Sequence, residues 1–117
     1  MTKKLFLVLL GFASQCHAAG KIPEQFQGKW TDSKASCKLF EEYGAPPNGG
    51  AHVQVTGIIR YEYYCDLKKV ISSSAEKFSG RFSCMGEGEE EKVTIQLVRN
   101  SAGILSLDGG AMRVRCN

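Results

Sequence analysis

The chain has 117 residues, of which 43% are hydrophobic and 23% charged, with 13 glycines, three prolines and five cysteines, as expected for one small globular domain. Its formal net charge is +3, but residues 1–18 hold two of the 15 basic residues and none of the 12 acidic ones, so the remainder is close to neutral. This balance excludes the basic field of a nucleic-acid binder and the polybasic segment of a peripheral membrane protein.

Residues 1–18 have the pattern of a secretory signal peptide. Lys3 and Lys4 precede the apolar run 5–10, and small residues lead to a cleavage site after Ala18. The apolar run is shorter than the roughly 20 residues of a membrane-spanning helix. We therefore predict one monomeric domain, residues 19–117, in the periplasm of a Gram-negative bacterium or outside the cell. An acylated N-terminus at Cys16 is the alternative.

The first part of this domain predicts a short strand, a helix and a loop. Residues 26–30 suit a strand, and Asp32 or Ser33 can cap a helix that continues to Glu42. We expect this helix to direct Ala35, Leu39 and Phe40 towards the core. Residues 43–50 contain two prolines and three glycines and predict a surface loop.

From His52 to Asp66 apolar and polar residues alternate, which predicts one long strand with a bend at Gly57. In this pattern Tyr61 and Tyr63 face the core and Tyr64 faces outward. The same period returns at 78–84, 93–97 and 112–116, with turn residues at 100–103 and 108–110. The prediction is an all-β fold with one short helix, forming a small antiparallel barrel or a curled meander sheet.

Four cysteines follow the signal segment, namely Cys37, Cys65, Cys84 and Cys116. An even number in a small exported domain predicts two disulfides, and their spacing lacks the Cys-x-x-Cys pairs of redox and zinc sites. A hairpin near Ser74 would place Cys65 opposite Cys84, but directly cross-strand bridges are usually strained. We favour the pairs Cys37–Cys65 and Cys84–Cys116, with the other pairings open.

Three groups of side chains are candidates for partner binding. The run 86–91 contains Glu87, Glu89 and Glu90, whose carboxylates suit a charged docking surface better than a calcium site, because the run lacks EF-hand spacing. Tyr64 is the second candidate, because tyrosine is a favoured interface anchor. The third is an arginine strip formed if neighbouring strands bring together Arg60, Arg81, Arg113 and Arg115.

Catalysis and cofactor binding have little support in the sequence. His52 is the one imidazole after the signal segment, and no Gly-x-Ser-x-Gly elbow accompanies it. No glycine-rich phosphate loop follows a strand. The sequence predicts neither an enzyme nor a bound metal or cofactor.

The motif Gly28-Lys29-Trp30, with the late arginines Arg113 and Arg115, resembles the opening Gly-x-Trp signature of lipocalins. That resemblance implies a barrel in which Trp30 is a structural anchor beside a late arginine. The layout of the whole domain is also similar to periplasmic inhibitors of lysozyme and proteases from Gram-negative bacteria.

Two functions follow as hypotheses. The first is a non-catalytic protein-binding or inhibitor module that uses loops 43–50 and 86–91 with Tyr64. The second is a lipocalin-like carrier of a small apolar ligand, which requires an interior cavity.

Overall fold

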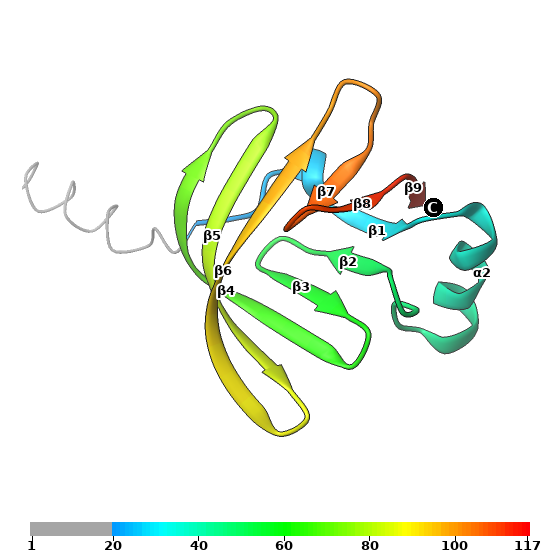
Figure 1. The fold of residues 1–117 in the computed structure, drawn as a ribbon, viewed down its shortest axis with the longest axis horizontal. Helices are drawn as coiled ribbons and strands as arrows, with labels where there is room; N and C mark the ends of the chain where they lie inside the picture. The colour runs from blue at the N-terminus through cyan, green and yellow to red at the C-terminus, as the bar shows by residue number, and fades with distance from the viewer. Residues whose placement is uncertain (1–19) are drawn as a thin grey trace, which may run out of the picture.

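A computed structural model describes residues 20–117, which form a nearly closed antiparallel β-barrel with a helix at one side (Figure 1). The predicted signal segment and Cys16 lie outside the described residues. The elements of the described part are η1 (Glu24–Phe26), β1 (Gly28–Thr31), α2 (Lys34–Tyr43), β2 (Ala51–Val53), β3 (Gly57–Arg60), β4 (Tyr63–Ser73), β5 (Lys77–Gly86), β6 (Glu89–Arg99), β7 (Leu105–Leu107), β8 (Gly110–Met112) and β9 (Val114–Cys116).

The barrel is an up-and-down meander closed by its last segment. Each strand from β1 to β7 pairs antiparallel with the next, and β9 returns to pair with β1. Strands β8 and β9 are separated by Arg113 alone, so residues 110–116 join the two edges of the sheet. The predicted all-β class and barrel architecture are confirmed, but the strand predicted at 112–116 is divided between β8 and β9, which lie at opposite edges of the sheet.

The prediction of a single strand from His52 to Asp66 is wrong. The segment is divided among β2, β3 and the start of β4, with turns at 54–56 and 61–62. Alternation of residue types continues through these tight turns, so the period alone does not reveal that the chain reverses. As a result Tyr61 lies in a turn with 52% of its surface exposed, contrary to its predicted burial, and Tyr63 is half-buried.

Helix α2 begins after Ser33, one of the two predicted capping residues, and ends at Tyr43, one residue beyond the predicted end. The Ser33 hydroxyl accepts a hydrogen bond from the backbone N–H of Ser36, and Gly44 ends the helix in the left-handed conformation at φ 67°. Phe40 is buried and Leu39 is half-buried, as predicted, whereas Ala35 is exposed. The helix therefore directs Phe40 into the protein interior and leaves Ala35 in solvent.

Side chains fill the interior of the barrel. The largest buried residues have at most 1% of their surface exposed, and they come from η1 and from strands around the whole barrel. Burial of such side chains is the main favourable term in folding. The members of this core include Phe26, Trp30, Ile58, Phe78, Phe82, Leu97 and Leu105.

All four cysteines of residues 20–117 are paired, as predicted, but the favoured connectivity is wrong. The bridges are Cys37–Cys116 and Cys65–Cys84. Cys65 and Cys84 are register partners on β4 and β5, with both side chains buried and a Cα–Cα distance of 4.0 Å. The pleat points both residues of a directly opposed pair to the same face, so the registered hairpin itself brings the two sulfurs together.

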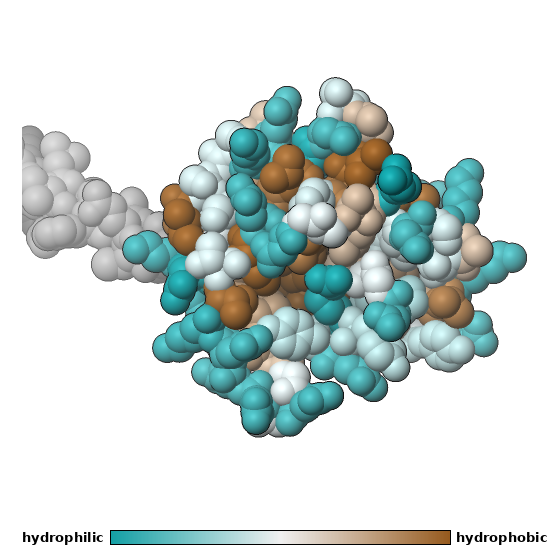
Figure 2. Space-filling view, in the orientation of Figure 1, coloured by the Kyte–Doolittle hydropathy of each residue, from teal (hydrophilic) through white to brown (hydrophobic). Residues whose placement is uncertain are grey.

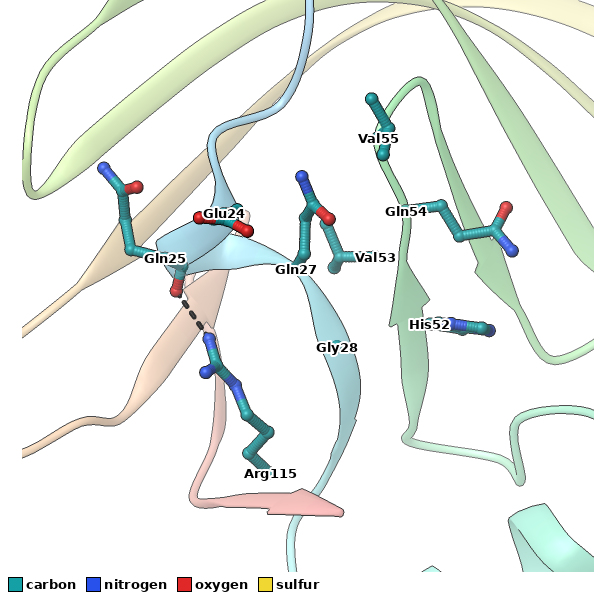
Figure 3. A pocket seen from close by; sticks show the side chains of 9 residues that line it. All are labelled: Glu24, Gln25, Gln27, Gly28, His52, Val53, Gln54, Val55 and Arg115. Carbon is teal, nitrogen blue, oxygen red and sulfur yellow. Dashed lines mark hydrogen bonds between the residues drawn. The ribbon is translucent and has the colours of Figure 1, made fainter. Parts of the chain in front are cut away.

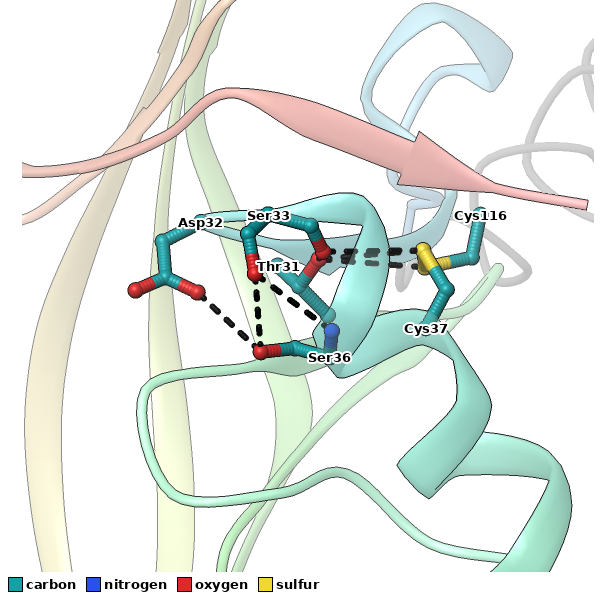
Figure 4. The surroundings of a disulfide bond; sticks show 6 residues. All are labelled: Thr31, Asp32, Ser33, Ser36, Cys37 and Cys116. Carbon is teal, nitrogen blue, oxygen red and sulfur yellow. Dashed lines mark hydrogen bonds between the residues drawn. A yellow bond between two sulfur atoms is a disulfide. The ribbon is translucent and has the colours of Figure 1, made fainter.

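The second bridge, Cys37–Cys116, joins α2 to β9, the strand that pairs with β1. Figure 4 shows the Thr31 hydroxyl beside both sulfur atoms, at 3.8 Å from each. The same hydroxyl donates to the carbonyl of Ser33 at 2.7 Å, just before the helix begins. The bridge and this contact together hold the start of α2 against β9.

Candidate functional site

The up-and-down topology sends successive connections to alternate ends of the barrel. One end carries the loop 44–50 and the turns at 61–62, 87–88 and 108–109, and we call it the turn end. The other carries η1 and the connections 54–56, 74–76 and 100–104, and we call it the η1 end. The sequence candidates divide between these two ends.

Acidic residues occupy all three tight turns of the turn end. Glu62, Glu87 and Asp108 have φ values of 54°, 52° and 49°, and in the described part of the chain they are the non-glycine residues with positive φ. Glu87 and Asp108 are each followed by a glycine with positive φ, the pattern of a type I′ hairpin turn. Asp-Gly is a favoured pair in such a turn, whereas glutamate gains no local hydrogen bond that offsets the left-handed conformation.

Tyrosines surround the acidic turns. Tyr61 lines a cavity of about 280 Å³ together with Glu62, Tyr63 and Glu87, which shows that the β3–β4 and β5–β6 turns lie side by side. The Tyr63 hydroxyl donates a hydrogen bond to Oε1 of Glu91 at 2.6 Å. This bond, together with burial and the charge of Glu91, raises the pKa of Tyr63 from 10.0 to about 12.

Tyr64 belongs to a row of outward-facing residues that crosses the barrel wall. It is register partner of Ile59 on one side and of Met85 on the other, and Tyr64 and Met85 are 43% and 48% exposed. Directly opposed residues share a face, so successive register partners form one row on the barrel surface. Basic side chains begin this row, largely apolar ones form its middle, and a carboxylate ends it. The row is Lys29, His52, Ile59, Tyr64, Met85 and Glu90.

The structure thus brings together the predicted residues Tyr64, Glu87, Glu89 and Glu90. The three glutamates are exposed at the tip of the β5–β6 hairpin, which is hydrophilic in the view of Figure 2. Sequence reasoning missed Tyr61, Glu62 and Met85 as members of the same surface. The Tyr61-Glu62 turn was hidden by the alternation of the segment, and Met85 is placed beside Tyr64 only by the strand register.

The predicted arginines do not form a strip. Arg60 on β3 donates from Nε to the carbonyl of Gly50 at 3.1 Å, and burial lowers the pKa of its guanidinium although the Asp108 carboxylate opposes that effect. Arg81 on β5 donates to the hydroxyl of Thr94. Arg113 is exposed between β8 and β9.

At the η1 end Trp30 is fully buried and lies beneath two guanidinium groups. The Arg115 guanidinium is 4.6 Å and that of Arg99 5.5 Å from the centre of the Trp30 ring, and both donate to the carbonyl of Gln25. A Cβ at Gly28 would lie 3.2 Å from Nε of Arg115, so glycine leaves the space that this side chain occupies. The Trp30 indole donates to the carbonyl of Phe26 at 3.0 Å.

Arg115 and His52 line an open groove of about 830 Å³ on the η1 side (Figure 3). They lie on opposite sides of β1, because β9 and β2 are its two neighbours. Burial, and then the charge of Lys29, lower the pKa of His52 below its ordinary value. A neutral imidazole at physiological pH follows, and the rest of the groove is lined largely by amide side chains and valines.

Within residues 20–117 no group of three or more His, Cys, Asp or Glu side chains has the geometry to hold a metal ion. The helices found there are also too short or too polar to cross a lipid bilayer.

Comparisons with protein-family models, with curated proteins and with solved structures find no match to this chain. The structure establishes a small all-β, nearly closed barrel braced by two disulfides.

Proposed function

We propose that this protein is an exported, non-catalytic binding protein that acts through its turn end on a partner protein with a basic surface. The observation that carries the proposal is the gathering of exposed tyrosines and carboxylates from two separate hairpins on that end. Tyrosine supplies large contact area at low entropic cost, and clustered carboxylates select a positively charged partner.

Export is part of the proposal. It is supported by the signal-like pattern of residues 1–18 and by the pairing of all four later cysteines, which is typical of proteins in oxidising compartments. The expected site of action is the periplasm or the exterior of the cell. A monomer that presents this surface to a partner fits both locations.

The filled core favours surface binding over the carriage of a small apolar ligand. Phe26, Trp30, Phe78 and Phe82 occupy the interior, where a carrier holds its ligand. The larger grooves of the described part open to solvent and are lined by surface residues. An inhibitor module is one form of the proposed activity, because an inhibitor also acts through a surface that covers its target.

The test compares two charge-matched double variants of the exported protein. E89Q/E90Q removes two carboxylates from the turn end, and E24Q/E76Q removes two from the η1 end. Each variant is cross-linked in the periplasmic and secreted fractions of its host at low and high salt. Purified lysozyme and a trypsin-like protease serve as candidate targets, and cytochrome c serves as a control for charge alone.

We expect a partner that is lost at high salt and in E89Q/E90Q but retained in E24Q/E76Q. Since electrostatic complementarity mainly raises the association rate, the expected loss in E89Q/E90Q is about tenfold in that rate. Equal recovery with both variants, or recovery that matches that of cytochrome c, would overturn the proposal.

A further inference from the structure

A second feature of the turn end is an apolar groove between α2 and the β3–β4 turn. It has a volume of about 400 Å³, and its walls include Tyr43, Pro46, Pro47, Tyr61 and Glu62. Tyr43 and Tyr61 are 68% and 52% exposed, so both rings are available to a partner. The groove is formed by residues from the end of the helix, the following loop and a separate hairpin.

The walls of this groove are fixed by contacts within the protein. Gly44 donates its N–H to the carbonyl of Phe40 at 2.9 Å, which ends the helix directly after Tyr43. Gly50 donates to the carbonyl of Pro47 at 2.9 Å, and its own carbonyl accepts from Arg60. Two consecutive prolines further restrict the loop. A groove that is already formed costs little conformational entropy when it binds.

The charge of the groove specifies the kind of side chain that it accepts. Glu62 lines both this groove and the cavity of about 280 Å³ that contains Glu87, so the two depressions adjoin. The path from Tyr43 to Glu87 is therefore aromatic at one end and acidic at the other. Two basic residues adjoin groove residues in the sequence. Arg60, before Tyr61, directs its Nε to the carbonyl of Gly50, and Lys38, before Leu39, lines a different groove.

We propose that this groove binds an extended basic segment of the partner protein and seats an arginine side chain of that segment. The aliphatic part of the arginine would pack against the prolines, its guanidinium would stack on a tyrosine ring, and the Glu62 carboxylate would pair with its charge. Aromatic-lined grooves bind segments that are already extended in solution, such as polyproline II helices, because a preformed conformation loses little entropy on binding. This inference rests on the proposed function and names the contact through which it is exercised.

The direct probe is a capped pentapeptide with one central arginine, compared with the same peptide carrying neutral citrulline. Binding is followed by backbone amide chemical shifts of the full mature protein. We expect saturable shifts confined to residues 39–48, 61–62 and 87, and at least tenfold weaker binding of the citrulline peptide. Equal binding of the two peptides, or shifts elsewhere on the barrel, would overturn the proposal.

Variants separate the groove from the rest of the barrel. Y43A and E62Q should each weaken binding of the arginine peptide at least fivefold, and I71A should not, because Ile71 is exposed on β4 towards the η1 end, outside the groove. Unchanged peptide binding in Y43A contradicts the inference. Far-ultraviolet circular dichroism of Y43A checks that the helix is retained.

The two proposals fail in different ways. If a partner is captured in a manner that depends on Glu89 and Glu90 but Y43A captures it equally well, the groove inference is wrong and the proposed function stands. If the arginine peptide binds in the groove but E89Q/E90Q and E24Q/E76Q capture the same proteins, the proposed function is wrong.

Discussion

The η1 end and the turn end of this barrel use the same classes of side chain in opposite ways. At the η1 end the Trp30 ring, two guanidiniums and the Gln25 carbonyl contact one another, and the indole is fully buried. At the turn end Tyr43, Tyr61 and the acidic residues of the tight turns stay exposed to solvent, and Tyr63 is the one tyrosine there that bonds to a carboxylate of the described chain. Aromatic and charged residues that contact one another stabilise the fold, whereas those left exposed are available to a partner.

The largest expected difference is between the aromatic residues of the two ends. Trp30→Ala should lower the free energy of unfolding by about 3–5 kcal/mol, because it leaves a large cavity beneath two guanidiniums. Tyr61→Ala should lower it by about 0.5 kcal/mol or less, because Tyr61 is half-exposed in a turn. Urea denaturation of the two variants measures both values. Similar losses in both would remove the distinction between the ends.

The arginines provide a second, smaller comparison. Arg115→Ala should lower the free energy of unfolding by about 1–2 kcal/mol, because it removes the contact with Trp30 and a hydrogen bond to the Gln25 carbonyl. Arg113→Ala is the matched control and should change the free energy of unfolding by about 0.5 kcal/mol or less, because Arg113 is exposed like Arg115 but does not share its contacts with Trp30 and the Gln25 carbonyl. Thermal unfolding midpoints should fall by roughly 4–16 °C for Arg115→Ala. An equal change in both variants would show that Arg115 does not brace Trp30.

The smallest effect concerns the hydrogen bond between Tyr63 and Glu91. The fold stabilises the protonated phenol, so its contribution is complete below the ordinary pKa of 10.0 and is lost as the pH rises through about 12. Titration in the ultraviolet absorption band of tyrosinate should show one of the four tyrosines ionising late. Tyr63→Phe should remove that late component, and Glu91→Gln should shift it to lower pH. A single transition for all four would contradict this bond.

The sequence predicts the fold well where one local pattern has one structural meaning. Ser33 could be named as a candidate start of α2 because capping depends on nearby residues alone. The alternation between His52 and Asp66 is compatible with two structures. One long strand and several short strands joined by tight turns give nearly the same sequence of residue types. Because of that ambiguity, the sequence predicts that Tyr61 is buried, whereas it is exposed in a turn.

The candidate site was less predictable than the fold, because it depends on register. Tyr64 and the glutamates of 87–90 could be named from residue type, but their proximity follows from the pairing of Tyr64 with Met85 and of Met85 with Glu90. The same reason explains the wrong cysteine pairing. Register decides which residues oppose one another across a hairpin, and a period of two does not determine it.

The nested arrangement of the two disulfides has a consequence for the order in which the protein matures. Cys65 and Cys84 are 19 residues apart and lie in one hairpin, whereas Cys37 is joined to Cys116 over 79 residues, at the strand that closes the barrel. In the proposed export, a chain that emerges N-terminus first exposes Cys37 and Cys65 before either native partner. Oxidation at that stage would join Cys37 to Cys65. The native pairs then require either that oxidation waits until Cys84 has emerged and paired with Cys65, or that a disulfide isomerase in the same compartment corrects the first bridge.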